Sequence, residues 1–171
     1  MIKHSLRHFI TEIAQCWSGL NSETVSKSRA LLSELAKAPS TEPWLVQLHE
    51  KKEESIELYR DEVHGFILLA HVERQGKYRV PHNHGAGWVL YAIQHGRMAM
   101  STYSSVTNQS GKTHLVSRGE ELITVGGCKA FLPGDIHDTE CLSDYVLMFR
   151  LTSCDFKKEK SEGRLIQYLS E

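Results

Sequence analysis

Two spaced patterns of glycine and histidine constrain the fold of this chain more than any other feature of its sequence. The first consists of Gly76, five residues, His82-Asn83-His84, four residues, Val89, six residues and Gly96. The second consists of Gly126, seven residues, Gly134, two residues and His137. Histidines two positions apart on a strand point to the same face, about 6.5 Å apart along it. Two such imidazoles can share one metal ion, and a third from a later strand beginning near His137 can complete the set.

The bulk composition bounds the kinds of protein that this chain can be. Its 171 residues predict one domain with a core that needs no disulfides. Lysine and arginine number 20 and aspartate and glutamate 21, so neither a nucleic-acid nor a membrane partner is expected. No apolar run reaches the ~18 residues of a membrane span, and the N-terminus lacks a signal-peptide core. Four cysteines without a CxxC pair favour free thiols in a cytoplasmic protein.

Residues 1–52 predict a helical region. Apolar residues recur there at helical spacing and form two stripes, namely Leu6, Phe9, Ile10 and Ile13, and then Leu31, Leu32 and Leu35. Asn21-Ser22 offers an N-cap for the second helix, and Pro39 and Pro43 end it. A third stretch, which contains Trp44, is either a short helix or irregular. Because both stripes need a partner surface and no linker follows, we expect the helices to pack on the next region.

Residues 53–156 predict a β-barrel region. Short apolar runs alternate with clusters of Gly, Asn, Ser and Asp, at residues 55–59, 65–72, 88–93, 98–103, 113–117, 121–125, 128–131 and 145–152. Seven or eight short strands with such turn signals indicate a closed or sandwiched β-domain. Residues 157–171 form the expected tail, charged and solvated over 157–163, with an edge strand or a short helix over 164–169.

The two glycine–histidine patterns resemble the paired motifs of the cupin superfamily. The resemblance implies a mainly β fold, a cupin-type double-stranded β-helix (jelly-roll barrel), with the N-terminal α-helices packed on it. In that superfamily a glutamate ligand stands at the position of Val89, a proline at that of Leu132 and an asparagine at that of Cys141. One His-x-His alone is weak evidence. Two spaced motifs with 29 residues between them are strong evidence.

Because Val89 stands in place of the glutamate ligand, the resemblance is narrowed to cupins with three histidine ligands. A three-histidine cupin preceded by helices is similar to the cysteine dioxygenase group and its bacterial thiol-dioxygenase relatives, over roughly residues 30–155, with the likeness carried by segments 58–66, 81–85 and 92–96. In that group a late strand carries a Ser-His-Tyr series, but Leu147, Phe149 and Leu151 take those positions here. The arginine that binds the substrate carboxylate falls near Ser55 or Ile56 and is missing. The resemblance implies a metal site but not oxidation of cysteine itself.

Three neutral imidazoles from His82, His84 and His137 suit Fe(II), and also Ni(II), Mn(II), Cu(II) or Zn(II). Such a ligand set brings no charge, so a divalent ion keeps its full charge and attracts an anionic ligand. Open coordination positions allow substrate and O₂ to bind side by side, or allow the metal to lower the pKa of a bound water. The alternative is that the three histidines are ordinary polar residues near loops. In that case both spaced motifs would have arisen by chance.

The strand after His84 predicts part of a substrate pocket. Alternation places Val89, Tyr91 and Ile93 on its inward face. Tyr91 is the candidate catalytic residue because its phenol can reach a substrate or bound oxygen; the alternative is a packed tyrosine bonded to the backbone. Trp88 lies at the expected barrel mouth, as a pocket wall or as simple packing.

A late strand predicts the rest of the pocket. Apolar alternation directs Leu147, Phe149 and Leu151 inward and Arg150 to solvent. The predicted pocket-lining residues are Trp88, Val89, Leu147 and Phe149. Such a pocket disfavours a free carboxylate, because no arginine would offset its desolvation. We therefore expect poor activity on cysteine and a substrate with one metal-binding group on an apolar body.

These inferences predict a mononuclear metalloenzyme with a three-histidine site, resembling Fe(II)- and O₂-dependent dioxygenases of a small thiol-like or metal-chelating substrate. One alternative is an oxygen-independent metalloenzyme, an isomerase, lyase or hydrolase that uses a bound water. Another is a non-enzymatic cupin that binds a metal or a small molecule. The expected partners are a small-molecule substrate and O₂, and a homodimer through an edge strand is the default assembly.

Overall fold

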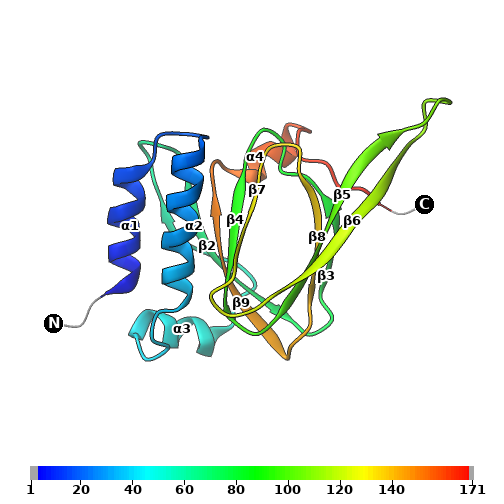
Figure 1. Ribbon diagram of the computed structural model, residues 1–171. Helices are drawn as coiled ribbons and strands as arrows, with labels where there is room; N and C mark the ends of the chain where they lie inside the picture. Colours follow the sequence, from blue (N-terminus) through cyan, green and yellow to red (C-terminus); the bar gives the residue numbers. More distant parts are fainter. Residues whose placement is uncertain (1–3, 170–171) are drawn as a thin grey trace.

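A computed structural model describes residues 4–169 of the chain, which form four helices and nine strands (Figure 1). The helices are α1 Ser5–Cys16, α2 Ser22–Ala36, α3 Pro43–Lys51 and α4 Phe156–Ser161. The strands are β1 Ile56–Arg60, β2 Ile67–Arg74, β3 Tyr78–His82, β4 Val89–His95, β5 Met98–Thr107, β6 Thr113–Ile123, β7 Cys128–Phe131, β8 Ile136–Cys141 and β9 Tyr145–Thr152. Residues 1–3 of the expected helical region and 170–171 of the expected tail lie outside the described residues.

The strands form two antiparallel sheets that face one another across a barrel. One sheet has the order β1-β2-β9-β4-β7, and the other has the order β3-β8-β5-β6. Apart from the β5–β6 hairpin, consecutive strands from β2 to β9 lie in opposite sheets, as in a jelly roll. Strand β9 lies between β2 and β4, and β8 lies between β3 and β5. The expected fold class, a mainly β jelly-roll barrel, is confirmed.

The N-terminal helices begin where local chemistry permits. The Asn21 side chain accepts a hydrogen bond from the Thr24 backbone N–H at 2.9 Å, which confirms the predicted N-cap of α2. Helix α3 begins at Pro43, a position that requires no backbone donor. Trp44 and Leu45 therefore lie on a regular helix rather than an irregular stretch.

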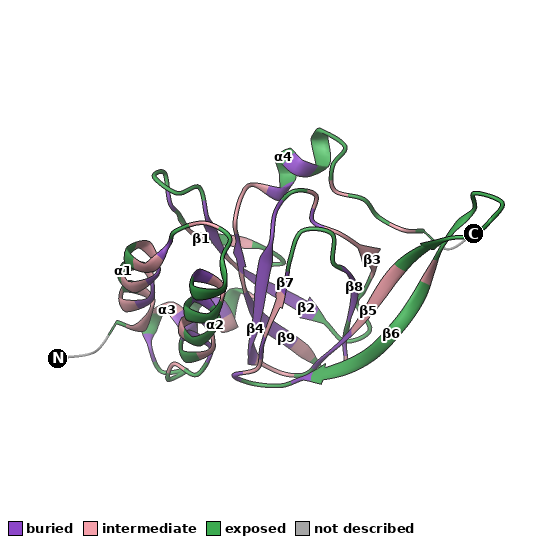
Figure 2. Ribbon diagram, turned by 45° about the horizontal axis from the view of Figure 1, so that its top comes forward, coloured by how far each residue is buried: buried purple, intermediate pink, exposed green. Residues whose placement is uncertain are grey.

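These helices cover the outer face of the five-stranded sheet (Figure 1). One apolar cluster joins the two layers. The helices contribute Phe9, Ile13, Leu32, Leu35 and Leu45, the strands contribute Leu68, Leu147, Phe149 and Leu151, and Phe66 joins them from just before β2. Full burial of each such side chain stabilises the fold by about 1.5–3 kcal/mol. The expectation that the helices pack on the barrel is confirmed. Figure 2 shows that β2, β4 and β9 are buried along most of their length, while β6 is largely exposed.

Three elements differ from the sequence expectations. Strand β3 was not predicted from the sequence. Its short segment is polar and contains Pro81, and proline disfavours a central strand. The runs 113–117 and 121–125 belong to one long strand, β6, which pairs with β5 in a hairpin that projects beyond the barrel (Figure 1). The charged stretch expected to be solvated contains helix α4, with Asp155 as its N-cap and Phe156 and Glu159 buried.

The segment after α4 forms neither a regular strand nor a helix. Gln167 makes a single bridge to His82, and the Tyr168 backbone N–H donates to the Pro81 carbonyl at 2.8 Å. The segment therefore runs alongside the end of β3. All four cysteines are free. Within residues 4–169, no helix has the length and apolar character needed to cross a membrane.

Candidate metal centre

The structure brings together the three histidines that the sequence patterns single out. His82 is the last residue of β3, His84 lies in the loop that follows, and His137 is the second residue of β8, paired in register with His82. One ligand atom from each imidazole lies within 4.8 Å of the others. Among residues 4–169 this is the one group of three or more His, Cys, Asp or Glu side chains with such spacing. His84 lies beyond the strand end, so a shared strand face does not explain the pairing.

The donor atoms fit a metal ion. The His82 Nδ1 lies 2.8 Å from the Val80 carbonyl, so it donates there and leaves Nε2 as the free lone pair. The Nε2 atoms of His84 and His137 lie 3.3 Å apart in a fully buried position, and the Nδ1 atom of each has no hydrogen-bond partner. At most one of two facing neutral Nε2 atoms can donate to the other, and His82 adds a further Nε2 lone pair, so this cluster of ring nitrogens suits a cation that takes up the lone pairs.

The electrostatic surroundings keep all three imidazoles neutral. Burial lowers the pKa of His84 to about 2 and the pKa of His137 well below its usual value, and the mutual repulsion of the three rings adds to both shifts. Burial likewise lowers the pKa of His82, against a hydrogen bond to Val80 that raises it. The neutral ring is the form that binds a metal, so no proton has to be displaced near pH 7.

Aromatic side chains enclose the triad. The Phe131 ring stacks on His137 with centroids 3.9 Å apart, and the Phe156 ring stacks on His84 at 5.0 Å. The Tyr91 hydroxyl lies 3.3 Å from the His84 Nε2. Burial raises the pKa of Tyr91, so it holds its proton and can donate it. Tyr91 thus faces the triad, and its catalytic role stays a prediction.

Three of the predicted pocket residues lie elsewhere. Leu147 and Phe149 belong to the cluster beneath the helices, and Trp88 stacks on Trp17 in the same cluster with centroids 5.0 Å apart. Both faces of β9 are covered, so apolar side chains are not directed only to the barrel, and the facing inferred from alternation was wrong. Val89 lies inside the barrel in a cluster with Tyr91.

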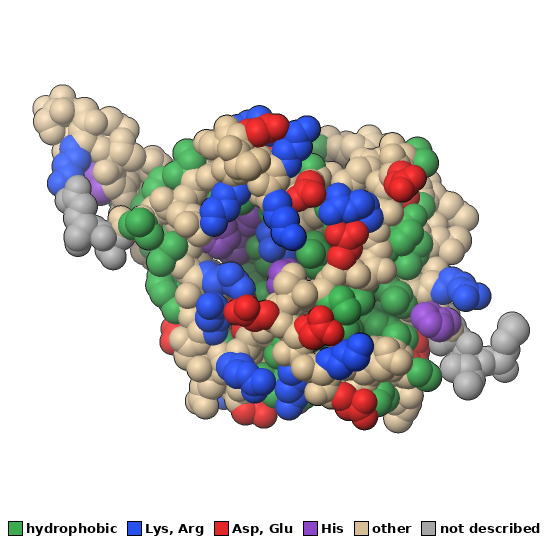
Figure 3. Space-filling view, turned by 180° about the vertical axis from the view of Figure 1, so that it is seen from behind, with side chains coloured by type: hydrophobic (Ala, Val, Ile, Leu, Met, Phe, Trp, Pro, Cys, Tyr) green, Lys and Arg blue, Asp and Glu red, His purple; other side chains and the backbone are tan. Residues whose placement is uncertain are grey.

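The opposite face of β9 lines a cavity of about 430 Å³ that reaches His82 of the triad. Its walls include His82, Tyr91, Met148, Arg150 and Phe156. The Arg150 guanidinium lies over the rings of Phe156 and Tyr91, 5.1 and 5.9 Å from their centroids. The expectation that Arg150 faces solvent is therefore wrong. Figure 3 shows the corresponding face, with histidine visible in a hollow and lysine and arginine side chains gathered around it.

Sequence reasoning missed several polar residues of this cavity. Arg79 comes from the unpredicted strand β3 and pairs with the buried Glu73 of β2. His71 on β2 has its Nδ1 3.2 Å from the Glu54 carbonyl, while its Nε2 has no partner, and burial together with nearby arginines lowers its pKa to about 3. To predict this polar wall, one would have to know which side chains of β2 and β9 point into the barrel. Both faces of these strands carry buried apolar residues, so the sequence pattern does not show this.

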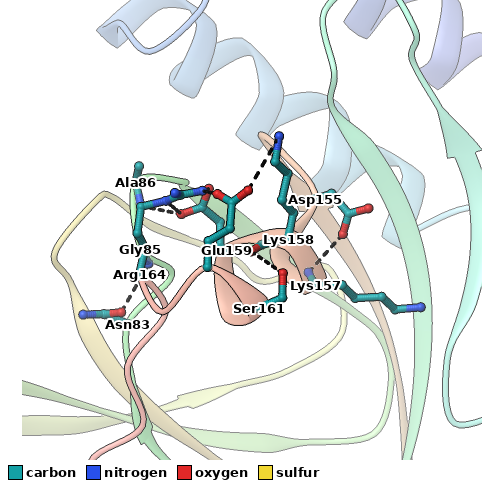
Figure 4. Close-up of polar contacts among 10 residues, drawn as sticks. Asn83, Gly85, Ala86, Asp155, Lys157, Lys158, Glu159, Ser161 and Arg164 are labelled. Carbon is teal, nitrogen blue, oxygen red and sulfur yellow. Dashed lines mark hydrogen bonds and ion pairs between the residues drawn. The ribbon is translucent and has the colours of Figure 1, made fainter.

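The segment after β9 secures the loop that carries His84 (Figure 4). The Asn83 side-chain oxygen accepts hydrogen bonds from the Gly85 N–H at 3.2 Å and from the Ile166 N–H at 2.9 Å. Glu159 accepts from the Ala86 N–H at 3.1 Å and binds Arg164 through two bonds of 2.8 Å. Gly85 has a φ of 62°, and a Cβ there would overlap Glu159. We call the contacts of Asn83 and Glu159 the loop latch.

Comparisons with known proteins find similarity only among solved structures. No protein-family model matches the sequence, and no curated protein matches it significantly. KdgF from Halomonas sp. is 11% identical, with a TM-score of 0.45 over 57% of this chain and 74% of that one. The cupin domain of Schizosaccharomyces pombe Cnp3 is 11% identical, with a TM-score of 0.47 over 64% and 66%. The DMSP lyase DddQ from Ruegeria pomeroyi DSS-3 is 13% identical, with a TM-score of 0.45 over 66% and 50%. The activity must therefore be inferred from the site itself.

Proposed function

We propose that this chain is a mononuclear metal-dependent enzyme whose ion is held by His82, His84 and His137. The observation that carries the proposal is the convergence of three imidazoles, one of which, His82, lines a cavity large enough for a small molecule. Structural metal sites are usually closed by four protein ligands, whereas catalytic sites keep an open position beside three. A fourth His, Cys, Asp or Glu ligand does not join this group among residues 4–169.

The surrounding side chains supply what a reaction in this cavity needs. When bound, the ion would act as a Lewis acid with open positions for substrate and O₂. Tyr91 holds a proton at its hydroxyl beside His84 and can donate it to a reacting group. Phe131 and Phe156 cover the rings of His137 and His84 and keep water from them.

The activity that we propose first is Fe(II)- and O₂-dependent oxidation of a small substrate that binds the ion through a thiol or a chelating group. Its support is the all-nitrogen, uncharged ligand set, which suits Fe(II), together with the resemblance of the sequence motifs to the thiol dioxygenases. A second candidate is an oxygen-independent isomerase, lyase or hydrolase. The neutral Tyr91 phenol favours this candidate, because such reactions need a proton donor at the substrate.

Elemental analysis followed by oxygen uptake tests the proposal. The purified protein is analysed for native metal, loaded anaerobically with Fe(II), and mixed with a panel of small thiols, enols and hydroxy-ketones in an oxygen electrode. We expect one metal ion per chain and substrate-dependent oxygen uptake that is absent from the His84→Ala variant. Turnover without oxygen uptake supports the second candidate. Bound metal without any turnover contradicts the enzyme, and failure to bind a divalent ion contradicts the metal centre.

A further inference from the structure

We propose that Arg150 binds an anionic group of the substrate, at the wall of the cavity that leads to the histidine triad. This proposal rests on the proposed function, because it assumes a substrate that also reaches the metal. It reverses the expectation of an apolar pocket, which depended on the wrong facing of β9.

The position of Arg150 follows from the sheet. Arg150 on β9 is the register partner of Tyr91 on β4, and Tyr91 in turn contacts His84. Arg150 and His82 line the same cavity. A molecule of a few heavy atoms that occupies this cavity can therefore contact the guanidinium at one end and the metal at the other.

Arg150 has aromatic neighbours but no ion-pair partner among the described residues. Arg79 pairs with Glu73, and the Lys77 ammonium lies 3.9 Å from Glu54. Arg150 forms no ion pair with any residue between 4 and 169, and its Nε is buried without a hydrogen-bond partner. A guanidinium cannot lose its proton, so an anionic group is the natural partner for its charge and its N–H donors.

The rest of the cavity wall points to the same kind of occupant. None of the described residues that line this cavity is Asp or Glu, whereas Lys157 and Lys160 add positive charge at its rim. The hollow bordered by lysine and arginine is visible in Figure 3. Such a surface attracts a small anion and raises its local concentration.

Two further polar atoms in this cavity lack partners. They are the His71 Nε2 and the Thr139 Oγ1, both buried. Since His71 donates through Nδ1 to the Glu54 carbonyl, its Nε2 is an acceptor, and Thr139 can donate or accept. Buried polar atoms are normally paired, so these atoms indicate that a polar ligand belongs here. The Arg150 guanidinium and the Thr139 hydroxyl can donate to an oxyanion, while the His71 Nε2 can accept from a donor group of the same ligand.

The ligand class is a small molecule with a metal-binding group at one end and a carboxylate or sulfonate at the other. Both oxyanions offer two or more acceptor oxygens to a guanidinium. The sequence motifs alone do not lead to this proposal, because the resemblance to the thiol dioxygenases implies no arginine on β9.

The test uses Co(II) as a spectroscopic probe of the triad. Thiolate binding to Co(II) produces a charge-transfer absorption band, which reports binding without turnover. Mercaptoacetate, 2-mercaptoethanesulfonate and the neutral mercaptoacetamide are titrated into Co(II)-loaded wild-type protein and the Arg150→Met variant. Arg97→Met is the matched control, because Arg97 is exposed in the turn between β4 and β5. Arg150→Gln and Arg150→Lys are second variants, the latter keeping the charge.

We expect the wild-type protein to prefer at least one anion over the amide. In Arg150→Met this preference falls roughly 10- to 100-fold, which is the factor that a charge-assisted hydrogen bond contributes, while affinity for the amide is unchanged. Arg97→Met keeps the preference, and Arg150→Lys keeps part of it. The anion whose binding weakens identifies the group as carboxylate or sulfonate.

The failures of the two proposals are distinguishable. If Co(II) binds but the anion preference is the same in the wild type, Arg150→Met and Arg150→Gln, or no thiol binds at all, the role of Arg150 is wrong and the metal centre stands. If Co(II) does not bind to the wild-type protein, the metal centre itself is wrong.

Discussion

The histidines of the triad are held by two kinds of neighbour. His82 is oriented by a backbone carbonyl, His84 by the Phe156 ring and His137 by the Phe131 ring. None of the three donates to a carboxylate, which is the usual way to strengthen an imidazole as a ligand. The affinity of the site therefore depends on all three rings together.

Replacing His84 with Ala is expected to remove most of the bound metal. A site with two remaining ligands rarely holds a divalent ion against buffer. The measurement is metal content after dialysis, with His114→Ala as control because His114 is exposed on β6. Stoichiometric metal in His84→Ala would show that this ligand is wrongly assigned.

Replacing Tyr91 with Phe separates a chemical role from a packing role. The change keeps the ring against Phe131 and His137 and removes only the hydroxyl beside His84. If Tyr91 donates a proton, kcat falls roughly 10²- to 10⁴-fold, while metal content stays at the wild-type level. An unchanged kcat in Tyr91→Phe would assign the tyrosine to packing.

At the scale of elements, the loop latch joins α4 to the loop that carries His84. Glu159 is buried, and its bonds to Arg164 and the Ala86 N–H lower its pKa to about 2. Because the pKa in the folded state is below the unfolded value, the stabilisation is complete above about pH 4.5 and is lost as the pH falls toward 2. The latch is therefore strongest at neutral pH.

The Glu159→Gln variant tests the latch. It removes the charge that binds Arg164 while keeping the shape, so we expect a lower urea midpoint and weaker metal binding at pH 7. The difference from the wild type should shrink at pH 3.5, because the unfolded carboxyl group is then mostly protonated and folding must release that proton. Glu62→Gln, at an exposed position, is the control. A difference that stays constant with pH would contradict the assigned role of the carboxylate.

Strands β3, β8 and β9 show how much of this site could be predicted from the sequence. The spacing of the two glycine–histidine patterns predicted which histidines meet, because the jelly roll pairs β3 with β8 whatever the other residues are. The facing of β9 could not be predicted, since Leu147 and Phe149 on one face and Met148 on the other are all apolar and buried. Arg150, the one charged residue of β9, could have indicated the inward face.

At the scale of the whole molecule, the helices and the barrel share one apolar cluster. The outer face of β2, β4 and β9 has no other cover among the described residues (Figure 2). We expect a shortened chain that begins at Glu53 to lose cooperative thermal unfolding and to aggregate, since it would expose a large contiguous apolar face. Differential scanning calorimetry checks this. An unchanged melting temperature would show that the barrel is stable without its helices.

The loop latch has a consequence for the order of events during synthesis. His82 and His84 emerge from the ribosome well before His137, and the residues that fix their loop, up to Ile166, emerge later still. The contacts that fix the His84 loop therefore form only after the chain has been synthesised through this segment. If the proposed metal centre exists, we expect the ion to be held firmly no earlier than that stage.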